Sequence, residues 1–241
     1  MKARILVVIP AHNEAESIEN VIFDIQKHIK NADILVINDC STDNTAEKII
    51  TGNGLSRIDN IFNLGYAYSV QTGIKYAHEN HYDFVIQMDA DGQHLASEAK
   101  KLLEAAEKES SDIVIGSRYC EANTYKAPLF RRFGTKMFER LIRIFCRQRI
   151  TDPLSGFQCL NKRTIEAYSK PGAYPEYPDA GLIIEMIMKG YKITEVPVTM
   201  KLRETGESMH SGIIQPITYM ATQFYTCIII FIKFIGRKIH E

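Results

Sequence analysis

The sequence of 241 residues has no excess of charge of either sign, because 29 Lys and Arg balance 29 Asp and Glu. Proteins that bind nucleic acid through bulk charge are basic, so this balance argues against a nucleic-acid partner. Cysteine is scarce too: the five cysteines are odd in number and form no C-x-x-C pair. The pattern argues against a disulfide framework or a zinc site and is typical of a reduced, cytosolic chain.

Two glycine-rich phosphate-binding loops are missing. The sequence has neither G-x-G-x-x-G nor G-x-x-x-x-G-K-[ST], so a dinucleotide fingerprint and a P-loop are both excluded. The apolar run 5–9 follows Lys2 and Arg4 but is too short for the core of a signal peptide. It predicts a first buried strand.

What is present is an alternation of apolar runs and helical patterns, in a chain that is 45% apolar and long enough for a large core. Strands are predicted at 5–9, 34–38, 57–62, 84–88, 113–116, 156–160 and 192–198, and helices at 16–29, 45–50, 68–78, 98–108 and 180–189. The strands lack polar alternation, as expected when both faces are covered. The fold class is therefore α/β, with a mostly parallel, Rossmann-like sheet flanked by helices.

Polar residues gather where the first five strands end, at 10–14, 38–41, 63–65, 89–93 and 117–118. Parallel α/β sheets bind ligands beyond the carboxyl ends of their strands. In the fourth loop Asp89, Asp91 and Gln93 offer oxygen ligands that could converge on a divalent cation and a diphosphate. A solvated turn is the alternative, because Asp and Gly also favour turns.

Two other loops carry groups suited to a nucleotide. Asp39 could accept hydrogen bonds from a nucleobase, or could cap the helix that follows. Asn63 and Gly65 could let a ligand approach the backbone closely, or could form a simple turn.

The second half is distinguished by a basic segment and an apolar tail. Residues 126–149 hold eight Lys or Arg against one acid, Glu139. Helical spacing places one apolar and one basic stripe side by side: Phe133, Met137, Leu141 and Ile144, and Arg132, Lys136, Arg140, Arg143 and Arg147. A solvated helix face is the usual explanation, but the near absence of acids favours an anionic membrane surface.

The tail is apolar over residues 219–235 and has a single charge there, Lys233. Its 17 residues fall just under the ~20 that span a bilayer, so an interfacial or shallowly inserted anchor is predicted, with a core helix or a homo-oligomer contact as alternatives.

A family resemblance rests on nine motifs in order: P-A-H-N-E, N-D-C-S-T-D-N-T, N-L-G, D-A-D-G-Q-H, G-S-R-Y, T-D-P-L-S-G-F, Y-P-D-A-G-L-I-I-E, G-Y-K-I-T-E-V-P-V and R-E-T-G-E-S-M-H. Together they resemble family 2 glycosyltransferases of the GT-A fold, in the branch of dolichol-phosphate mannosyltransferases and polyprenyl-phosphate glycosyltransferases. The match extends over residues 4–212, so a catalytic domain 1–212 and a membrane-associating helix 213–241 are expected.

The resemblance implies a role for each matching residue. The donor nucleotide would lie on Pro10, Asn13, Glu14, Asp39, Asn63, Gly65, Asp89 and Ala90, and Mg²⁺ or Mn²⁺ on Asp89, Asp91 and Gln93. Arg118, Arg131 and Arg132 would face the acceptor's phosphate, and Asp91, Asp152 and Arg203 would serve catalysis, with Arg203 closing over the donor diphosphate. The implied reaction is metal-dependent, inverting transfer from a GDP- or UDP-sugar to a lipid phosphate at the cytoplasmic face of a membrane.

Two departures from the family pattern bear on the substrate. Cys40 stands in place of a usual glycine, and Met209 replaces a usual lysine, which weakens the mannosyltransferase assignment in particular. Transfer to a sugar hydroxyl remains an alternative, with Asp152 as the base that such an acceptor would need. A catalytically silent nucleotide-sugar-binding protein and a nucleotidyltransferase are further alternatives. The intact Asp89, Asp91 and Arg203 argue against the silent protein, and the missing glycine-rich loop argues against the nucleotidyltransferase.

Overall fold

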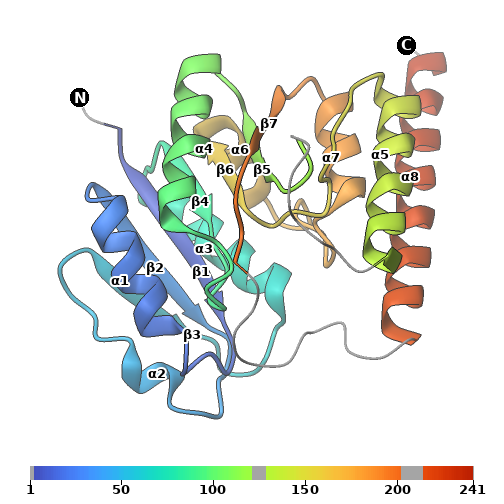
Figure 1. The fold of residues 1–241 in the computed structure, drawn as a ribbon. Helices are drawn as coiled ribbons and strands as arrows, with labels where there is room; N and C mark the ends of the chain where they lie inside the picture. The colour runs from blue at the N-terminus through green and yellow to red at the C-terminus, as the bar shows by residue number, and fades with distance from the viewer. Residues whose placement is uncertain (1–2, 121–128, 202–213, 241) are drawn as a thin grey trace.

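The computed structural model describes residues 3–120, 129–201 and 214–240. A seven-stranded sheet lies at its centre, in the strand order β3-β2-β1-β4-β6-β5-β7 (Figure 1). The strands are β1 (Ile5–Ala11), β2 (Ala32–Asn38), β3 (Leu55–Asp59), β4 (Phe84–Gln87), β5 (Ile113–Ser117), β6 (Gln158–Asn161) and β7 (Ile193–Pro197). All neighbours pair in parallel except β6, which runs antiparallel to β4 and β5. The predicted mostly parallel sheet is confirmed.

Alternate residues of β1 belong to two separate cores. Leu6 and Val8 face one layer of helices, whereas Ile5, Val7 and Ile9 face the other. Successive side chains of a strand point to opposite faces, so a run without polar residues supplies both cores at once. The first core packs under α3 (Tyr66–Glu79) and α6 (Lys162–Ser169), and the second under α1 (Ile18–His28) and α4 (Ala96–Glu109).

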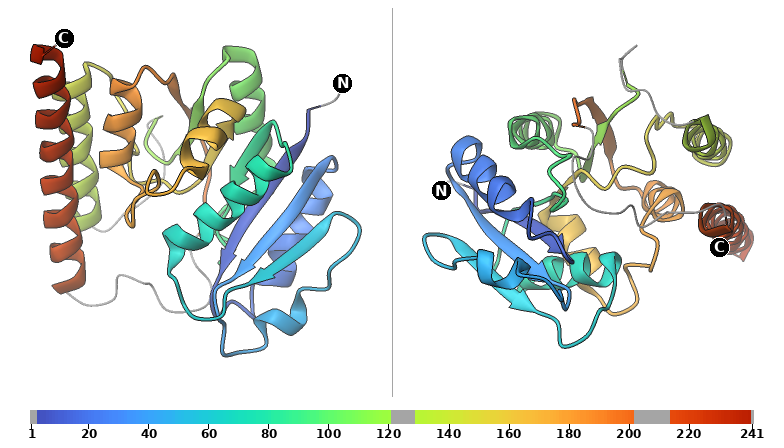
Figure 2. Two further views of the ribbon diagram at one scale, coloured as in Figure 1. Left: turned by 180° about the vertical axis from the view of Figure 1, so that it is seen from behind. Right: turned by 60° about the horizontal axis from the view of Figure 1, so that its bottom comes forward.

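Three helices lie beyond the β7 end of the sheet. They are α5 (Leu129–Cys146), α7 (Ala180–Met188) and α8 (Ile214–His240), and their axes run side by side (Figure 2). Phe145 of α5 stacks on Phe231 of α8, with ring centroids 3.9 Å apart. At Gly181 of α7, an added Cβ would lie 3.0 Å from Thr226 Cγ2, so α8 packs closely there. The tail helix is thus part of the folded unit.

Several elements differ from the sequence prediction. The helix α2 is a single turn, Thr45–Lys48, and β3 starts and ends earlier than predicted. After β3, the Asn60 N–H still donates to the Asn38 carbonyl oxygen at 2.9 Å, whereas the Leu64 N–H donates to the Asp39 carboxylate at 2.9 Å, so the chain has turned away from β2 by Leu64. Helix α6 was not predicted; it begins at an Asn161 cap, whose side chain accepts from the Thr164 N–H at 3.0 Å.

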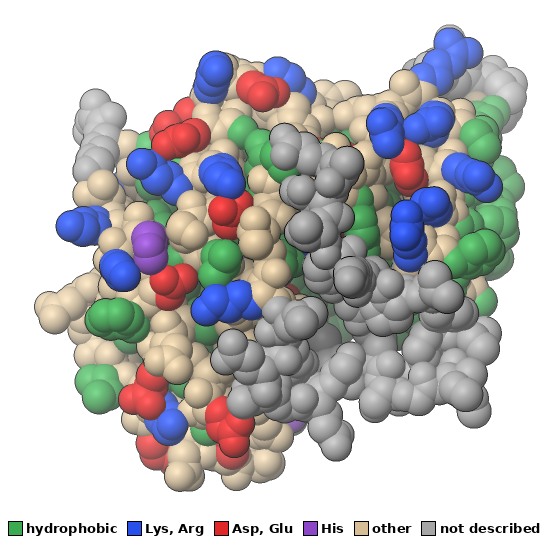
Figure 3. All heavy atoms as spheres, in the orientation of Figure 1, with side chains coloured by type: hydrophobic (Ala, Val, Ile, Leu, Met, Phe, Trp, Pro, Cys, Tyr) green, Lys and Arg blue, Asp and Glu red, His purple; other side chains and the backbone are tan. Residues whose placement is uncertain are grey.

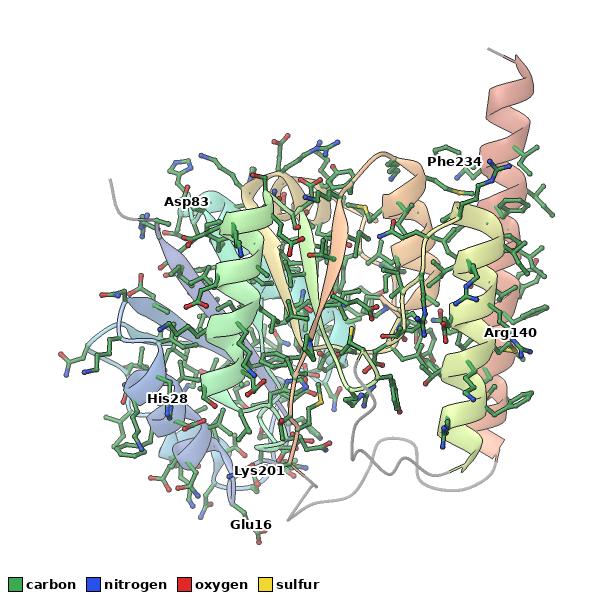
Figure 4. All side chains as sticks on the ribbon, turned by 45° about the horizontal axis from the view of Figure 1, so that its top comes forward. Glu16, His28, Asp83, Arg140, Lys201 and Phe234 are labelled. Atoms are coloured by element: carbon green, nitrogen blue, oxygen red, sulfur yellow. The ribbon has the colours of Figure 1, made fainter. Side chains whose placement is uncertain are left out.

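The predicted apolar stripe of α5 is only half covered. Phe133 and Ile144 are 67% and 70% exposed, whereas Phe138 and Ile142, outside that stripe, are fully buried. The basic residues are exposed, and Figure 3 shows Lys and Arg side chains over α5 beside the apolar face of α8. Arg140 of α5 and Phe234 of α8 lie on the same side of the molecule, away from the sheet (Figure 4).

The apolar part of the tail is longer than predicted. The 19-residue segment Thr218–Gly236 is long and apolar enough to cross a membrane, and only 11% of it is buried. It adds only Thr218 and Gly236 to the predicted apolar residues 219–235, and the helix around it, Ile214–His240, agrees with the predicted helix 213–241.

Candidate active site

A pocket of about 450 Å³ lies at the carboxyl ends of β1, β2 and β4. All eight residues predicted to bind the donor nucleotide line it, namely Pro10, Asn13, Glu14, Asp39, Asn63, Gly65, Asp89 and Ala90, and so does Asp91. Carboxyl ends of parallel strands meet at one edge of a sheet, which brings these distant segments together. His12, Tyr66 and Ser69 also line the pocket and were not predicted.

Asp39 fixes the loop that forms one wall of this pocket. Asp39 as a whole is 3% exposed, and its carboxylate accepts hydrogen bonds from the backbone N–H groups of Leu64 and Gly65, at 2.9 and 2.8 Å. Gly65 itself has a positive φ of 86°, which explains the glycine there. Asp39 therefore shapes the Asn63–Gly65 loop, whatever else it binds.

The loop after β1 is tied to the loop after β2. Asn13 Oδ1 accepts from the Thr42 N–H at 2.8 Å, and the Glu14 N–H donates to Thr45 Oγ1, also at 2.8 Å. His12 Nδ1 lies 2.8 Å from the Asp39 carbonyl oxygen. These contacts hold the first two motifs in one rigid frame.

Asp89 stands at the end of β4 between two neighbours that orient its carboxylate. The Tyr66 hydroxyl donates to Oδ1 at 3.1 Å, and burial together with that carboxylate raises the pKa of Tyr66 well above its usual range. On the other side, His94 Nδ1 accepts from the Asp89 N–H at 3.0 Å, which directs Nε2 toward Oδ2 at 3.6 Å. His94 is itself buried and stacks on Phe157.

The predicted metal ligands form an incomplete set of oxygen donors. Asp91 accepts from the Gln93 N–H at 3.0 Å and from Gln93 Nε2 at 2.6 Å. Among the described residues no group of three or more His, Cys, Asp or Glu could hold a metal ion. Two carboxylates and an amide oxygen suit Mg²⁺ or Mn²⁺ when a diphosphate and water supply the remaining ligands.

Arg118 and Asp152 form a buried ion pair. Asp152 is fully buried, and its two carboxylate oxygens accept from Arg118 Nε and Nη2 at 2.7 and 2.8 Å. The Arg118 N–H adds a third hydrogen bond at 3.0 Å. A carboxylate held in this way is poorly placed to accept a proton from a substrate, and Asp152 lines neither of the two larger pockets.

A second, larger pocket of about 640 Å³ adjoins the first and shares Gly65, Tyr66 and Asp89 with it. Its far wall is formed by Tyr174, Glu176, Tyr177 and Asp179, which precede α7, and by Tyr219 of α8. Burial and the charge of Asp152 raise the pKa of Asp179 to about 6, and the Tyr219 hydroxyl, which donates to Asp179, opposes the shift.

Some predicted residues cannot be placed against these pockets. Arg203 and Met209 lie outside the described residues, and so does the side chain of Arg131. Arg132 is exposed on α5. Asp179 and Tyr219 were missed because nothing in the sequence signals that segments 40 residues apart meet.

Comparison with known proteins identifies the family. Residues 6–168 match the family described as "Glycosyl transferase family 2". The chain is 30% identical to undecaprenyl-phosphate mannosyltransferase of Micrococcus luteus over 220 residues, which are 87% of this chain and 88% of that protein. It is 33% identical to dolichol-phosphate mannosyltransferase of Pyrococcus furiosus, covering 87% of this chain and 60% of the longer relative.

A solved structure shares the fold. The mannosyltransferase PcManGT of Pyrobaculum calidifontis, determined with GDP-Man and Mn²⁺, superposes with a TM-score of 0.67 at 17% identity, covering 95% of this chain and 65% of that one. The likeness confirms the expected GT-A fold, a mostly parallel sheet flanked by helices. Because the family match covers residues 6–168 and the fold agrees with it, the chain belongs to glycosyl transferase family 2 and is a glycosyltransferase.

Proposed function

We propose that this glycosyltransferase moves a sugar from a GDP- or UDP-sugar to a polyprenyl or dolichyl phosphate at the cytoplasmic face of a membrane. The observation that carries the proposal is the meeting of two pockets at Asp89, one lined by every predicted donor residue and one open beside it. The names of the relatives, undecaprenyl-phosphate and dolichol-phosphate mannosyltransferase, support a lipid phosphate as acceptor.

The reaction would be a direct displacement with inversion. An oxygen of the acceptor's phosphate attacks the anomeric carbon, and the bond from that carbon to the β-phosphate oxygen breaks. The electron pair leaves with the nucleoside diphosphate. A phosphate monoester is largely ionised near neutral pH, since its second pKa is about 6, so this acceptor needs no protein base.

The donor side calls for a divalent cation. The described residues of the smaller pocket include four carboxylates and no Lys or Arg, which is unfavourable for a diphosphate alone. Bound Mg²⁺ or Mn²⁺ would neutralise charge that develops on the leaving diphosphate. Asp89, Asp91 and Gln93 would hold it, with Tyr66 and His94 keeping Asp89 oriented. The Mn²⁺ in PcManGT is consistent with this assignment.

A sugar hydroxyl is the second candidate acceptor, and the position and pKa of Asp179 favour it. Asp179 lines the larger pocket, and burial raises its pKa to about 6, a value suited to a general base near neutral pH. If the acceptor is a hydroxyl, Asp179 is better placed than Asp152, which Arg118 holds.

The decisive experiment incubates purified protein in detergent with UDP- and GDP-sugars, with polyprenyl phosphate or with a lipid-linked glycan. Product should form with polyprenyl phosphate, and only with Mg²⁺ or Mn²⁺. The variants Asp89→Asn and Asp91→Asn should lose transfer while keeping the wild-type melting temperature. Product on the glycan alone would replace the proposal with the second candidate, and activity in EDTA would overturn the metal assignment.

A further inference from the structure

Glu195 is a charged residue on an apolar face of the sheet. It lies in β7, where successive side chains point to opposite faces, so it shares a face with Ile193. Ile193 belongs to the first core, and so does Ile115, which pairs with Glu195 from the neighbouring strand β5. Burial raises the pKa of Glu195, because it removes the ionised carboxyl from water. An ionised carboxylate on such a face is stable only if several donors surround it.

These donors come from the start of the 151–157 segment, which lies between α5 and β6. The Thr151 N–H donates to Glu195 Oε2 at 2.7 Å, and the Asp152 N–H donates to Oε1 at 2.8 Å. The Thr151 hydroxyl lies 3.1 Å from both oxygens. One carboxylate thus holds two consecutive backbone N–H groups. Glutamine has a single accepting oxygen, so it could hold one of them but would turn its own N–H toward the other.

The 151–157 segment forms part of the wall of the larger pocket. Leu154 and Gly156 line that pocket, and none of the seven residues of the segment lines the smaller pocket. Gly156 also packs against Tyr66: an added Cβ would lie 2.7 Å from the Tyr66 hydroxyl oxygen, which donates to Asp89. The position of the segment therefore determines the shape of the larger pocket where the two pockets meet.

Asp152 extends the same anchor to the carboxyl end of β5. Glu195 holds its backbone N–H, and its buried carboxylate accepts from Arg118 Nε and Nη2. Arg118 is the residue expected at the acceptor's phosphate. Glu195 lines neither pocket, so it can act on the acceptor only through the residues that it holds.

We propose that Glu195 is a positioning residue for the acceptor: it fixes the 151–157 segment, and through it the wall of the larger pocket and Arg118. The inference rests on the proposed function in taking the larger pocket as the acceptor's side and the smaller pocket as the nucleotide site. It gives a role to the E-V-P motif of β7, which reaches neither pocket directly. Loss of one carboxylate oxygen at Glu195 should weaken acceptor binding and leave nucleotide binding intact.

The test compares Glu195→Gln with a matched control at the opposite end of the same strands. Asp112 is buried and precedes β5, and its carboxylate accepts from the Lys192 N–H at 2.8 Å and from Asn161 Nδ2 at 2.9 Å. Asp112→Asn therefore also removes a charge that ties β5, β6 and β7 together, but it does so at the amino ends of β5 and β7. Both variants should lower the melting temperature.

Only Glu195→Gln should change the kinetics of the acceptor. In detergent with Mn²⁺, its KM for polyprenyl phosphate should rise about tenfold, the loss of one hydrogen bond to a charged group. Its KM for the nucleotide-sugar, and its affinity for UDP or GDP measured by calorimetry, should equal those of wild type. Asp112→Asn should keep the wild-type KM for both substrates. The inference is overturned if Glu195→Gln matches Asp112→Asn in acceptor KM, or if its donor KM rises as much as its acceptor KM.

If Glu195→Gln does not fold, Glu195→Asp takes its place. This variant keeps the charge but draws the carboxylate back by one methylene, so the same change in acceptor KM is expected. The same rise in donor KM as in acceptor KM, or no rise in either, would again contradict the inference.

Amide hydrogen exchange followed by mass spectrometry tests the anchor without any transfer. Peptides that cover 151–157 should exchange faster in Glu195→Gln than in wild type and Asp112→Asn, whereas peptides that cover 10–14 and 38–41 should not. If wild-type protein transfers sugar to no acceptor but exchange in 151–157 still rises, the proposed function is wrong and the anchoring by Glu195 stands. Unchanged exchange in 151–157 overturns the inference whatever the enzyme transfers.

Discussion

Asn13 and Cys40, in the loops beside the smaller pocket, share a left-handed backbone conformation with φ of +56°. This conformation costs an L-residue about 1–2 kcal/mol, and asparagine tolerates it best. The two side chains differ in what they contribute. Asn13 Oδ1 accepts from both the N–H and the hydroxyl of Thr42, at 2.8 and 3.2 Å, whereas Cys40 Sγ reaches only the Ile61 carbonyl oxygen at 3.6 Å.

Replacing each residue by glycine should therefore have opposite effects. Cys40→Gly should raise the free energy of unfolding by about 0.5–1 kcal/mol, because strain is relieved and little is lost. Asn13→Gly should lower it by about 1 kcal/mol or more, because two hydrogen bonds disappear. Urea unfolding followed by circular dichroism measures both. A destabilised Cys40→Gly protein would show that the Cys40 contact outweighs the backbone strain.

Asp179 predicts a pH dependence of stability. Its pKa of about 6 in the folded protein exceeds the usual value near 3.9 in an unfolded chain. Between these pH values the Asp179 carboxyl keeps its proton in the folded protein but loses it in the unfolded chain. Proton binding by Asp179 therefore stabilises the folded protein fully below pH ~4, and this stabilisation is lost as the pH rises through ~6. The groups that act on Asp179 are the Tyr219 hydroxyl, which opposes the shift, and the charge of Asp152, which adds to it.

The melting temperature of wild type should thus fall between pH 4 and 7 relative to that of Asp179→Asn, by a few degrees. Burial also raises the pKa of Glu195, but that residue is present in both proteins and cancels in the difference. Melting curves recorded at half-unit pH intervals give the difference directly. Parallel pH profiles would mean that the Asp179 pKa is close to its ordinary value.

The contact of α3 with β1 depends on Gly73. A Cβ at this position would lie 2.2 Å from Val8 Cγ1, and Val8 is fully buried. Alanine would gain about 1 kcal/mol in helix propensity, but overpacking a core costs about 1–3 kcal/mol, and here the contact is far below van der Waals distance. Gly73→Ala should therefore destabilise the protein by about 2 kcal/mol.

The matched control is Gly236→Ala on α8, where an added Cβ meets nothing within 4 Å. This variant should be neutral or slightly more stable. The double variant Val8→Ala/Gly73→Ala should be more stable than the sum of the single changes implies, because each relieves the other. If the changes in the free energy of unfolding of the two single variants simply add in the double variant, the proposed clash between Gly73 and Val8 is wrong.

The elements differ in how far the sequence determines them. The strands β1, β2, β4 and β5 were predicted because a buried parallel strand is a short β-branched run. The position of the smaller pocket then followed, because the carboxyl ends of parallel strands lie at the same edge of the sheet. Helix α6 has only eight residues and shows too little periodicity to be predicted. The Tyr66–Asp89 and Tyr219–Asp179 contacts depend on tertiary packing, so Tyr66, Asp179 and Tyr219 could not be assigned to the site beforehand.

On the scale of the whole molecule, α5 and α8 form one surface, and we expect both its basic and its apolar residues to bind a membrane. Arg132, Lys136 and Arg140 are exposed on α5, and Tyr225, Ile229 and Ile232 are exposed on α8. Basic residues near an anionic surface contribute about 1 kcal/mol each, and salt screens them. Apolar burial is not weakened by salt in this way.

Two sets of substitutions should separate these contributions. Glutamine at the three basic positions should reduce sedimentation with anionic liposomes about 100-fold at low salt, which corresponds to about 3 kcal/mol, with little effect at high salt. Serine at the three apolar positions should abolish the binding that survives a high-salt wash. If wild-type protein remains in the supernatant at low salt, the proposed membrane association is wrong.

The orientation of α8 follows from where the rest of the fold holds it. Its contacts with the domain run from Tyr219, which donates to Asp179, to Phe231, which stacks on Phe145, a length of about 18 Å. The hydrocarbon core of a bilayer is about 30 Å thick. If Thr218–Gly236 crossed it upright, the basic residues of α5 and the Asp179 side chain, which pack beside α8, would enter the hydrocarbon as well. Burying those charges is expensive, so we expect α8 to lie flat in the interface, with Tyr225 and Ile232 toward the lipid.

The chain contains no tryptophan, so single introduced tryptophans report depth without background. Tyr225→Trp and Ile232→Trp place the probe on one face of α8, seven residues and about 10 Å apart along the axis. Lipids brominated at different depths quench the fluorescence of a nearby tryptophan. If α8 lies flat, bromines at the same shallow depth should quench both tryptophans most strongly. An upright helix separates the two depths by nearly the full 10 Å, and that result would require α8 to detach from Phe145 and Asp179 when the protein binds a membrane.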